Sequence, residues 1–303
     1  MKAKNCLPRF TTTPSKLMAA AACCLLLQSA QATLLFSDGF NYTSGGNLYS
    51  ASTSYQASPS ANTPSVTIGS VSLTYSGLSD FSPPGNAVSV ATGSSTAAQT
   101  AASFAAQNSG TVYASFLLDV TSLAAGQTQN YGLAGMLPTG AGYASGTDPC
   151  GIVLLGSGAN AYDLGVRSSG NGSGSNHAYT GGALTPNTTY LIVLKYDYSA
   201  NKASIYIDPT SLGGADPGTP SASMTTPGGA SPLNLSQFYL REGGNSLGAS
   251  DPSAPFLVDD LRVGTTWTDV TPAAVPEPAA SALIGLGVLG LGISRRIGRR
   301  IAG

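Results

Sequence analysis

Short stretches of alternating apolar and polar residues recur between residues 33 and 270, separated by Gly, Pro, Ser and Asn. In Thr111–Val120, every second residue from Val112 onward is apolar, and the residues between them are mostly polar. A two-residue repeat is the pattern of a β-strand with one buried face. We therefore predict a half-buried strand over this range.

A second stretch, Tyr190–Tyr196, is apolar on both faces, which predicts a central strand. Ala203–Ile207 follows after four turn-forming residues and predicts the partner strand of a hairpin. The other predicted strands are Ser65–Ile68, Val71–Tyr75, Ala87–Val90, Gly132–Met136, Ile152–Leu155, Ala161–Val166, Gln237–Arg241 and Phe256–Val263. So many short strands favour an all-β fold, a two-sheet antiparallel sandwich.

Helix-forming sequence is scarce in this region. Ala97–Gln107 is rich in Ala and Gln and predicts a helix, although it lacks a clear cap. Ser168–Asn176 and Leu212–Ser231 are rich in Gly, Ser or Pro and are predicted to be surface loops within one domain, residues 33–270. A Pro-rich stalk is expected at residues 271–278.

The formal net charge of −1 is the sum of three unequal parts. Residues 1–32 carry four bases and no acid, and residues 294–303 also carry four bases. Residues 33–274 hold five bases and thirteen acids, a net charge of −8. This acidic middle lacks the basic surface that binds nucleic acid, so we exclude that class of partner.

The N-terminus has the features of a secretory signal peptide. The four bases precede an apolar run of eleven residues, Leu17–Leu27, and Ala30 and Ala32 form the small-x-small pattern of a signal peptidase site. We predict a signal helix in residues 1–32 and cleavage after Ala32. Three of the four cysteines would then be lost, so Cys150 is left without a disulfide partner and is expected to be structural.

The C-terminus carries a second processing pattern. Val275-Pro276-Glu277-Pro278 precedes an uncharged run of fifteen residues, residues 279–293, and a basic tail, residues 294–303. The bases of this tail are Arg295, Arg296, Arg299 and Arg300. Such a run followed by arginines is a stop-transfer element. At about 1.5 Å per residue the run covers about 22 Å of a core of about 30 Å, so this short transmembrane helix suits a temporary anchor.

These three parts, in this order over residues 275–303, resemble the PEP-CTERM sorting signal of Gram-negative bacteria. The resemblance implies that an exosortase, a cysteine protease of the inner membrane, removes the tail near Pro276-Glu277-Pro278. It also implies passage across the inner membrane, a transient membrane anchor, and delivery to the cell surface or the extracellular polysaccharide matrix. The alternative is an ordinary, permanent single-pass anchor.

A second resemblance covers most of residues 33–270. It rests on the segments Phe36–Phe40, Leu73–Leu78, Gly85–Val88, Thr111–Leu117, Thr189–Tyr196, Ser204–Pro209 and Val258–Gly264. The series is similar to LamG-like, concanavalin A-type jelly rolls. This resemblance implies a jelly-roll sandwich whose first and last strands are neighbours. It also implies a fold whose members often bind carbohydrate or calcium.

Catalytic chemistry has little support in the sequence. A glycosidase usually needs two carboxylates about 5–10 Å apart, and the Glu-x-Asp-x-x-Glu strand shared by hydrolases of this fold is missing. Glu242 lies in a turn sequence, and Asp259 and Asp260, as adjacent strand residues, should point in opposite directions. The single histidine, His177, is interpreted as a solvated loop residue. We expect no enzyme; the alternative is a divergent polysaccharide-active glycosidase or lyase.

Calcium is the one cofactor that the residues suggest, because it prefers oxygen ligands. Asp38 and either Asp259 or Asp260 can converge if the first and last strands pair. The alternative, which we favour, is that these aspartates only serve turns and strand edges.

Glycan contact would use exposed tyrosines beside polar residues. The candidates are Tyr42, Tyr49, Tyr55, Tyr143 and Tyr179. Each can equally cover the core of a loop, and Trp267 is expected to pack the end of the sandwich. The sequence thus predicts an exported structural or adhesive domain that binds glycan weakly if at all. Its processing partners would be signal peptidase and exosortase.

Overall fold

The structure is a computed structural model. It describes residues 33–57, 66–81, 83–91, 99–123, 131–138, 149–156, 160–168, 177–226, 234–241 and 254–274. The chain divides into two compact units, Met1–Ala32 and Thr33–Gly303, and every described residue lies in the second. The predicted signal helix, the transmembrane helix, the basic tail, Tyr143 and Glu242 lie outside the described residues.

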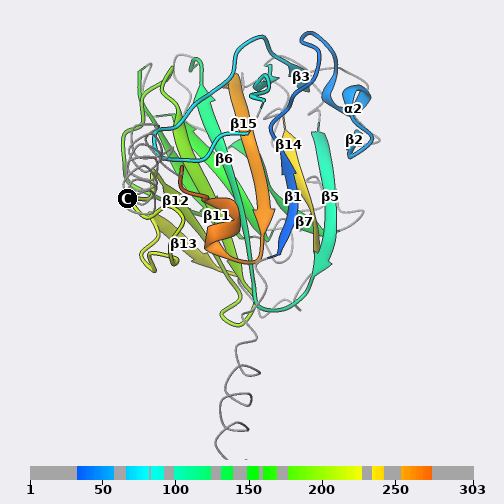
Figure 1. The fold of residues 1–303 in the computed structure, drawn as a ribbon. Helices are drawn as coiled ribbons and strands as arrows, with labels where there is room; N and C mark the ends of the chain where they lie inside the picture. Colours follow the sequence, from blue (N-terminus) through cyan, green and yellow to red (C-terminus); the bar gives the residue numbers. More distant parts are fainter. Residues whose placement is uncertain are drawn as a thin grey trace, which may run out of the picture. The chain divides into compact units, whose positions relative to one another are not determined.

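Two antiparallel sheets form the described part of the chain (Figure 1). The first sheet runs in the order β13 (Ala222–Thr225), β12 (Lys202–Ile207), β11 (Tyr190–Asp197), β6 (Thr111–Val120), β15 (Phe256–Gly264), β4 (Val88–Val90) and β3 (Val66–Ile68). The second runs in the order β10 (His177–Tyr179), β9 (Tyr162–Arg167), β8 (Cys150–Gly156), β7 (Tyr131–Pro138), β14 (Leu235–Arg241), β5 (Gln99–Gln107) and β2 (Tyr55–Ala57). The predicted two-sheet jelly-roll sandwich is confirmed.

The first strand, β1 (Leu34–Asp38), pairs with the last, β15. Leu34 lies opposite Gly264, and Asp38 lies opposite Leu261. The neighbouring first and last strands implied by the jelly-roll resemblance are therefore present. On the β1 side, β15 also pairs with β4, while β6 pairs along its other side.

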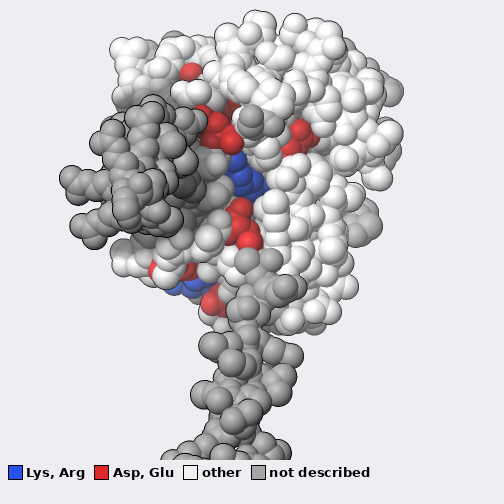
Figure 2. Space-filling view, in the orientation of Figure 1, with Lys and Arg blue, Asp and Glu red and all other residues white. Residues whose placement is uncertain are grey.

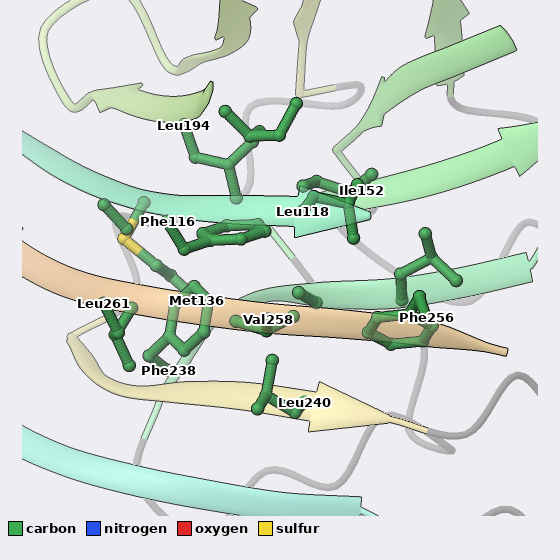
Figure 3. Close-up of a cluster of buried hydrophobic side chains, with 14 of the residues drawn as sticks. Phe116, Leu118, Met136, Ile152, Leu194, Phe238, Leu240, Phe256, Val258 and Leu261 are labelled. Atoms are coloured by element: carbon green, nitrogen blue, oxygen red, sulfur yellow. The ribbon is translucent and has the colours of Figure 1, made fainter. Parts of the chain in front are cut away.

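The core lies between the two sheets and is built from alternate residues of both. Phe116 of β6 meets Phe238 of β14 edge to face, with ring centroids 5.4 Å apart. Figure 3 shows both rings among Met136, Val258 and Leu240, which also point into the space between the sheets. Such edge-to-face aromatic pairs contribute about 0.5–1.5 kcal/mol beyond the area they bury.

The prediction that β6 is buried on one face only is wrong. Tyr113, Ser115 and Leu117, on its other face, are 7%, 0% and 0% exposed. A second apolar cluster covers them, contributed by loops and by α3 (Trp267–Val270): Leu73, Leu78, Trp267 and Val270. These residues come from segments that precede and follow β6 at a distance in the sequence, so no local pattern around β6 indicates the cover.

Two further secondary-structure predictions are wrong. Ala97–Gln107 is not a helix, because Gln99–Gln107 forms β5 between β14 and β2. Pairing on both sides outweighs the small helix preference of alanine. Val71–Tyr75 is not a strand; its Leu73 N–H donates to Asp259 instead. Within the described residues, neither α2 (Leu48–Ala51) nor α3 is long and apolar enough to cross a membrane.

Residues 271–274, which the sequence assigns to the stalk, lie against the sandwich. Thr271 is fully buried, and its carbonyl accepts a hydrogen bond from the Gly213 N–H. The Pro272 carbonyl accepts from the Ser79 N–H at 2.8 Å, and the Ala274 N–H donates to the Gly77 carbonyl at 2.9 Å. We call residues 271–274 the C-terminal latch.

Candidate functional site

The residues of the two processing patterns lie outside the described part of the chain. They are Ala30, Ala32, Val275, Pro276, Glu277, Pro278, Arg295, Arg296, Arg299 and Arg300. The three aspartates considered for calcium are all described, and so are the seven strands of the second sheet.

Asp38 ends β1 and holds the turn that follows it. One carboxylate oxygen accepts the Phe40 N–H at 2.7 Å, and the other accepts the Tyr42 hydroxyl at 2.8 Å. Phe40 has a φ of 51°, a left-handed conformation that is rare for a bulky residue. The preceding residue must be a glycine, because a Cβ on Gly39 would lie 2.7 Å from the ring of Phe81. Asp38 therefore acts as a turn residue.

Asp259 anchors the loop that covers β6. The side chain is 1% exposed, and one oxygen accepts the Leu73 N–H at 2.8 Å and the Ser72 hydroxyl at 3.0 Å. The other oxygen accepts the Asp260 N–H at 2.9 Å. Burial raises the pKa of Asp259, and these three donors oppose that shift.

Asp260 lies in a β-bulge, where the pairing register of β15 with β6 shifts between Asp259 and Arg262. Its φ of 54° breaks the alternation on which the prediction of opposite-pointing carboxylates depended. Burial raises the pKa of Asp260 to about 6, and the Arg262 guanidinium, 4.0 Å away, opposes the rise. The like charges of Asp259 and Asp80 add to it.

Arg262 is the cation at the centre of this acidic group. Its guanidinium is 5% exposed, donates to the Ser79 carbonyl at 2.5 Å, and lies 4.2 Å from the centroid of the Phe81 ring. Figure 2 shows that acidic and basic side chains lie near one another on the face of the domain seen in that view. Arg262 therefore connects β15 to the loop before β4 through its contacts with Ser79 and Phe81.

The described residues contain no group of three or more His, Cys, Asp or Glu that can hold a metal ion. Both oxygens of Asp38 and of Asp259 already accept hydrogen bonds from the protein. Calcium at Asp38, Asp259 and Asp260 stays a prediction, and the hydrogen bonds give Asp38 and Asp259 a structural role.

The outer face of the second sheet carries a row of seven residues, one from each strand. Each residue lies directly opposite the next, while its chain neighbours point into the core. The row is Gln56, Ala101, Tyr239, Gly135, Gly151, Arg167 and His177. Gly135 and Gly151 leave the middle of the row without side chains. A Cβ on Gly135 would lie 3.0 Å from the Tyr239 ring.

Beyond these glycines, the sheet ends in a polar and aromatic edge. We call Asp163, Arg167, His177, Tyr179 and Thr180 the β9–β10 rim. The rings of His177 and Tyr179 meet edge to face at 5.0 Å, and a Cβ on Gly165 would lie 2.8 Å from the Tyr179 ring. One oxygen of Asp163 accepts the Thr180 hydroxyl at 2.5 Å. All five rim residues are half-buried and thus partly open to solvent.

The structure corrects the interpretation of His177 as a loop residue, because it begins β10 and pairs with Arg167. Burial, and secondly the charge of Arg167, lowers the pKa of His177 below 6.5, so its ring is neutral at pH 7. The sequence did not indicate the rim. The alternation of His177 and Tyr179 was the available signal, but two residues are too few to predict a strand.

The tyrosines considered for glycan contact have different surroundings. Tyr55 is 4% exposed and packs edge to face on Phe36, so it belongs to the core. Tyr42 donates its hydroxyl to Asp38, and Tyr49 is 41% exposed. Trp267 is buried as expected, but it covers the outer face of the first sheet.

Comparison with known proteins confirms the resemblance of the C-terminus to the PEP-CTERM signal. Residues 274–296 match the PEP-CTERM protein-sorting motif. The motif implies that the chain is exported, is processed by an exosortase and is sorted to the cell surface. No curated protein matches the sequence.

Several solved β-structures are similar to the chain in fold. The endo-1,3-β-glucanase of Streptomyces sioyaensis has a TM-score of 0.46 and 11% identity, over 77% of this chain and 96% of that one. The CBM2 module of the evolved Dit protein of Lactobacillus casei BL23 phage J-1 has a TM-score of 0.44 and 10% identity, over 78% and 97%. A sialidase has a TM-score of 0.36 and 10% identity over 59% of this chain, which spans 15% of the sialidase. At these scores, none of the three bears on ligand or activity.

Proposed function

We propose that this chain is a non-catalytic structural or adhesive protein of the cell surface or extracellular polysaccharide matrix, and that it contacts glycan through the β9–β10 rim. The observation that carries the proposal is the composition of this rim. An aromatic ring, a carboxylate, a guanidinium and a neutral imidazole stand together on a partly open sheet edge.

These groups suit a sugar. The ring of Tyr179 offers an apolar face with a hydroxyl at its end. Asp163 is held by the Thr180 hydroxyl and by the Gly181 N–H at 2.9 Å, so its carboxylate is fixed before any ligand arrives. Residues 33–274 carry a net charge of −8, which disfavours polyanions and favours a neutral glycan.

Catalysis is not proposed, because the rim lacks the paired carboxylates of a glycosidase. Asp163 is the only acidic residue in the seven described strands of the second sheet. Within the described strands of this sheet it therefore has no second carboxylate to act with it as glycoside hydrolysis requires. His177 has Arg167 opposite it, and this charge disfavours the protonated form that a general acid needs.

Retention of the purified exported protein on isolated exopolysaccharide and on a neutral glucan tests the binding proposal. We expect Tyr179→Ala to reduce retention several-fold, because it removes the only rim side chain with a stacking face of this kind. Tyr49→Ala is the matched control, since Tyr49 is 41% exposed elsewhere on the domain. Equal retention of both variants, or no retention of the unmodified protein, would contradict the proposal.

Calcium dependence is read in the same experiment. Retention that disappears in chelator and returns with calcium would support the predicted site at Asp38, Asp259 and Asp260.

Mass spectrometry of the C-terminus separates sorting from permanent anchoring. We expect the mature chain to end near Pro276-Glu277-Pro278, and an intact Arg299-Arg300 end would contradict exosortase processing.

A further inference from the structure

The C-terminal latch holds the chain up to the first residue of the sorting motif. The motif begins at Ala274, whose N–H donates to the Gly77 carbonyl at 2.9 Å. The neighbouring Pro272 carbonyl accepts the Ser79 N–H, and the Thr271 carbonyl accepts the Gly213 N–H. Three separate backbone bonds therefore tie Thr271, Pro272 and Ala274 to two different loops.

The loop that carries Gly213 is itself fixed to the first sheet. The Asp216 carboxylate accepts Lys195 Nζ at 2.7 Å, the Tyr113 hydroxyl at 2.9 Å and the Tyr206 hydroxyl at 3.0 Å. The Trp267 indole N–H donates to the Ser211 carbonyl at 2.9 Å. The latch thus closes on a loop that three strand side chains hold in place.

The spacing between the latch and the cleavage motif is very short. Only Val275 separates Ala274 from Pro276, and an extended residue spans at most about 3.6 Å. The covalent chain therefore allows at most about 7 Å between the Cα atoms of Ala274 and Pro276. A protease that binds its substrate as an extended strand needs several free residues on both sides of the scissile bond. With the latch closed, the chain on the domain side of the scissile bond supplies almost no free residues.

We propose that the latch is an autoinhibitory contact, and that exosortase removes the tail efficiently only when residues 271–274 leave the sandwich. The inference rests on the proposed exosortase processing of this chain. Cleavage is peptide-bond hydrolysis: water adds across the C–N bond, which leaves a carboxylate on the domain and an amine on the tail. The latch controls access to that bond and takes no part in the chemistry.

Two glycine variants of one loop test the proposal without touching the motif. A Cβ on Gly213 would lie 2.8 Å from the Ala273 Cβ and 3.1 Å from the Ala273 nitrogen, so Gly213→Ala pushes the latch open. Gly218→Ala is the matched control. Gly218 has a similar positive φ, 75° against 66°, and nothing lies within 4 Å of its Cβ position. The two variants share the backbone strain and differ in the contact with the latch.

Tail removal is followed in cells by pulse-chase of the full chain with an epitope at its C-terminus. We expect the tail to be removed several-fold faster from Gly213→Ala than from Gly218→Ala. A six-residue Gly/Ser insertion between Ala274 and Val275 frees the motif without opening the latch. It should accelerate removal equally, and Gly213→Ala should add nothing further in that background.

The outcomes distinguish the proposed autoinhibitory contact from the proposed exosortase processing on which it rests. If the tail leaves the unmodified chain, and neither Gly213→Ala nor the insertion exceeds Gly218→Ala, the autoinhibitory contact is refuted and exosortase processing stands. If no variant and no unmodified chain loses its tail, the processing proposal itself is refuted. Hydrogen exchange at the Ser79 and Ala274 amides of the purified protein should be faster in Gly213→Ala, and unchanged exchange would count against the latch.

Discussion

Replacement of Asp260 by Asn is expected to stabilise the protein at neutral pH. The carboxylate is 5% exposed, and burial raises its pKa from an ordinary 3.8 to about 6. The folded state therefore binds this proton more tightly than the unfolded state does. Between about pH 4 and pH 6, the free energy of unfolding falls as the pH rises, and above pH 6 the full penalty remains.

The size of the effect follows from the same pKa. At about 1.36 kcal/mol per pKa unit, ionised Asp260 costs the folded protein about 3 kcal/mol at pH 7. Asn keeps the shape without the charge, and it tolerates a φ of 54° better than most residues do. Arg262 keeps the Ser79 carbonyl and the Phe81 ring. We expect Asp260→Asn to stabilise by about 1–3 kcal/mol at pH 7.5 and by nearly nothing at pH 3.5.

The adjacent residue provides the control, with the opposite sign. Asp259 accepts three hydrogen bonds on two oxygens, and Asn has only one oxygen. Its amide would place a donor against the Leu73 or the Asp260 N–H. We expect Asp259→Asn to destabilise by about 1–3 kcal/mol at pH 3.5 and by less at pH 7.5, because the raised pKa means that the unmodified folded protein loses stability as Asp259 ionises.

Urea unfolding of the purified protein, followed by circular dichroism at pH 3.5 and pH 7.5, measures both variants. With a slope of about 2–3 kcal/mol per molar urea, changes of about 1–3 kcal/mol shift the midpoint by about 0.3–1.5 M. The reasoning about buried charge is refuted if Asp260→Asn destabilises at pH 7.5. It is also refuted if the stabilisation is the same at both pH values.

Three further predictions concern packing. Gly135→Ala should lower the unfolding midpoint strongly, because its Cβ would lie 2.5 Å from the Cys150 carbonyl oxygen; Gly182→Ala, where the nearest atom is 3.5 Å away, should leave the midpoint nearly unchanged. Phe238→Ala should cost about 3–5 kcal/mol in urea unfolding, since it leaves a cavity against Phe116; a loss below about 1 kcal/mol would contradict the core as described. The fully buried Cys150 thiol should react with a thiol reagent only in urea, and rapid labelling of the native protein would contradict its burial.

The sequence correctly predicted strands that are rich in apolar residues. Thr111–Val120 and Phe256–Val263 were predicted as strands, and the structure has strands at Thr111–Val120 and Phe256–Gly264. β5 was mistaken for a helix because its alanines favour helix locally, whereas pairing with β14 and β2 is a long-range effect. The cover on the outer face of β6 was missed for the same reason, since it comes from distant loops.

The candidate sites also differ in how far the local sequence predicts them. Asp38 was predictable as a turn residue, because Asp-Gly after a strand is a local signal. The bulge at Asp260 could not be predicted from the sequence, because a bulge depends on the partner strand. The β9–β10 rim depends on the register of neighbouring strands, which places Arg167 beside His177. A shift of one residue would turn these side chains to the opposite face, and no sequence motif indicates which register forms.

The position of β15 has a mechanical consequence for a protein tethered at its C-terminus. Tension applied at Ala274 passes through the latch and α3 into β15. This strand is bonded to β6 along one side and to β4 and β1 along the other, so it is not an edge strand. To peel it away, a pulling force must break ladders on both flanks. A pull applied at residues 271–274 would therefore act on a strand that is hydrogen-bonded on both sides rather than on an edge strand.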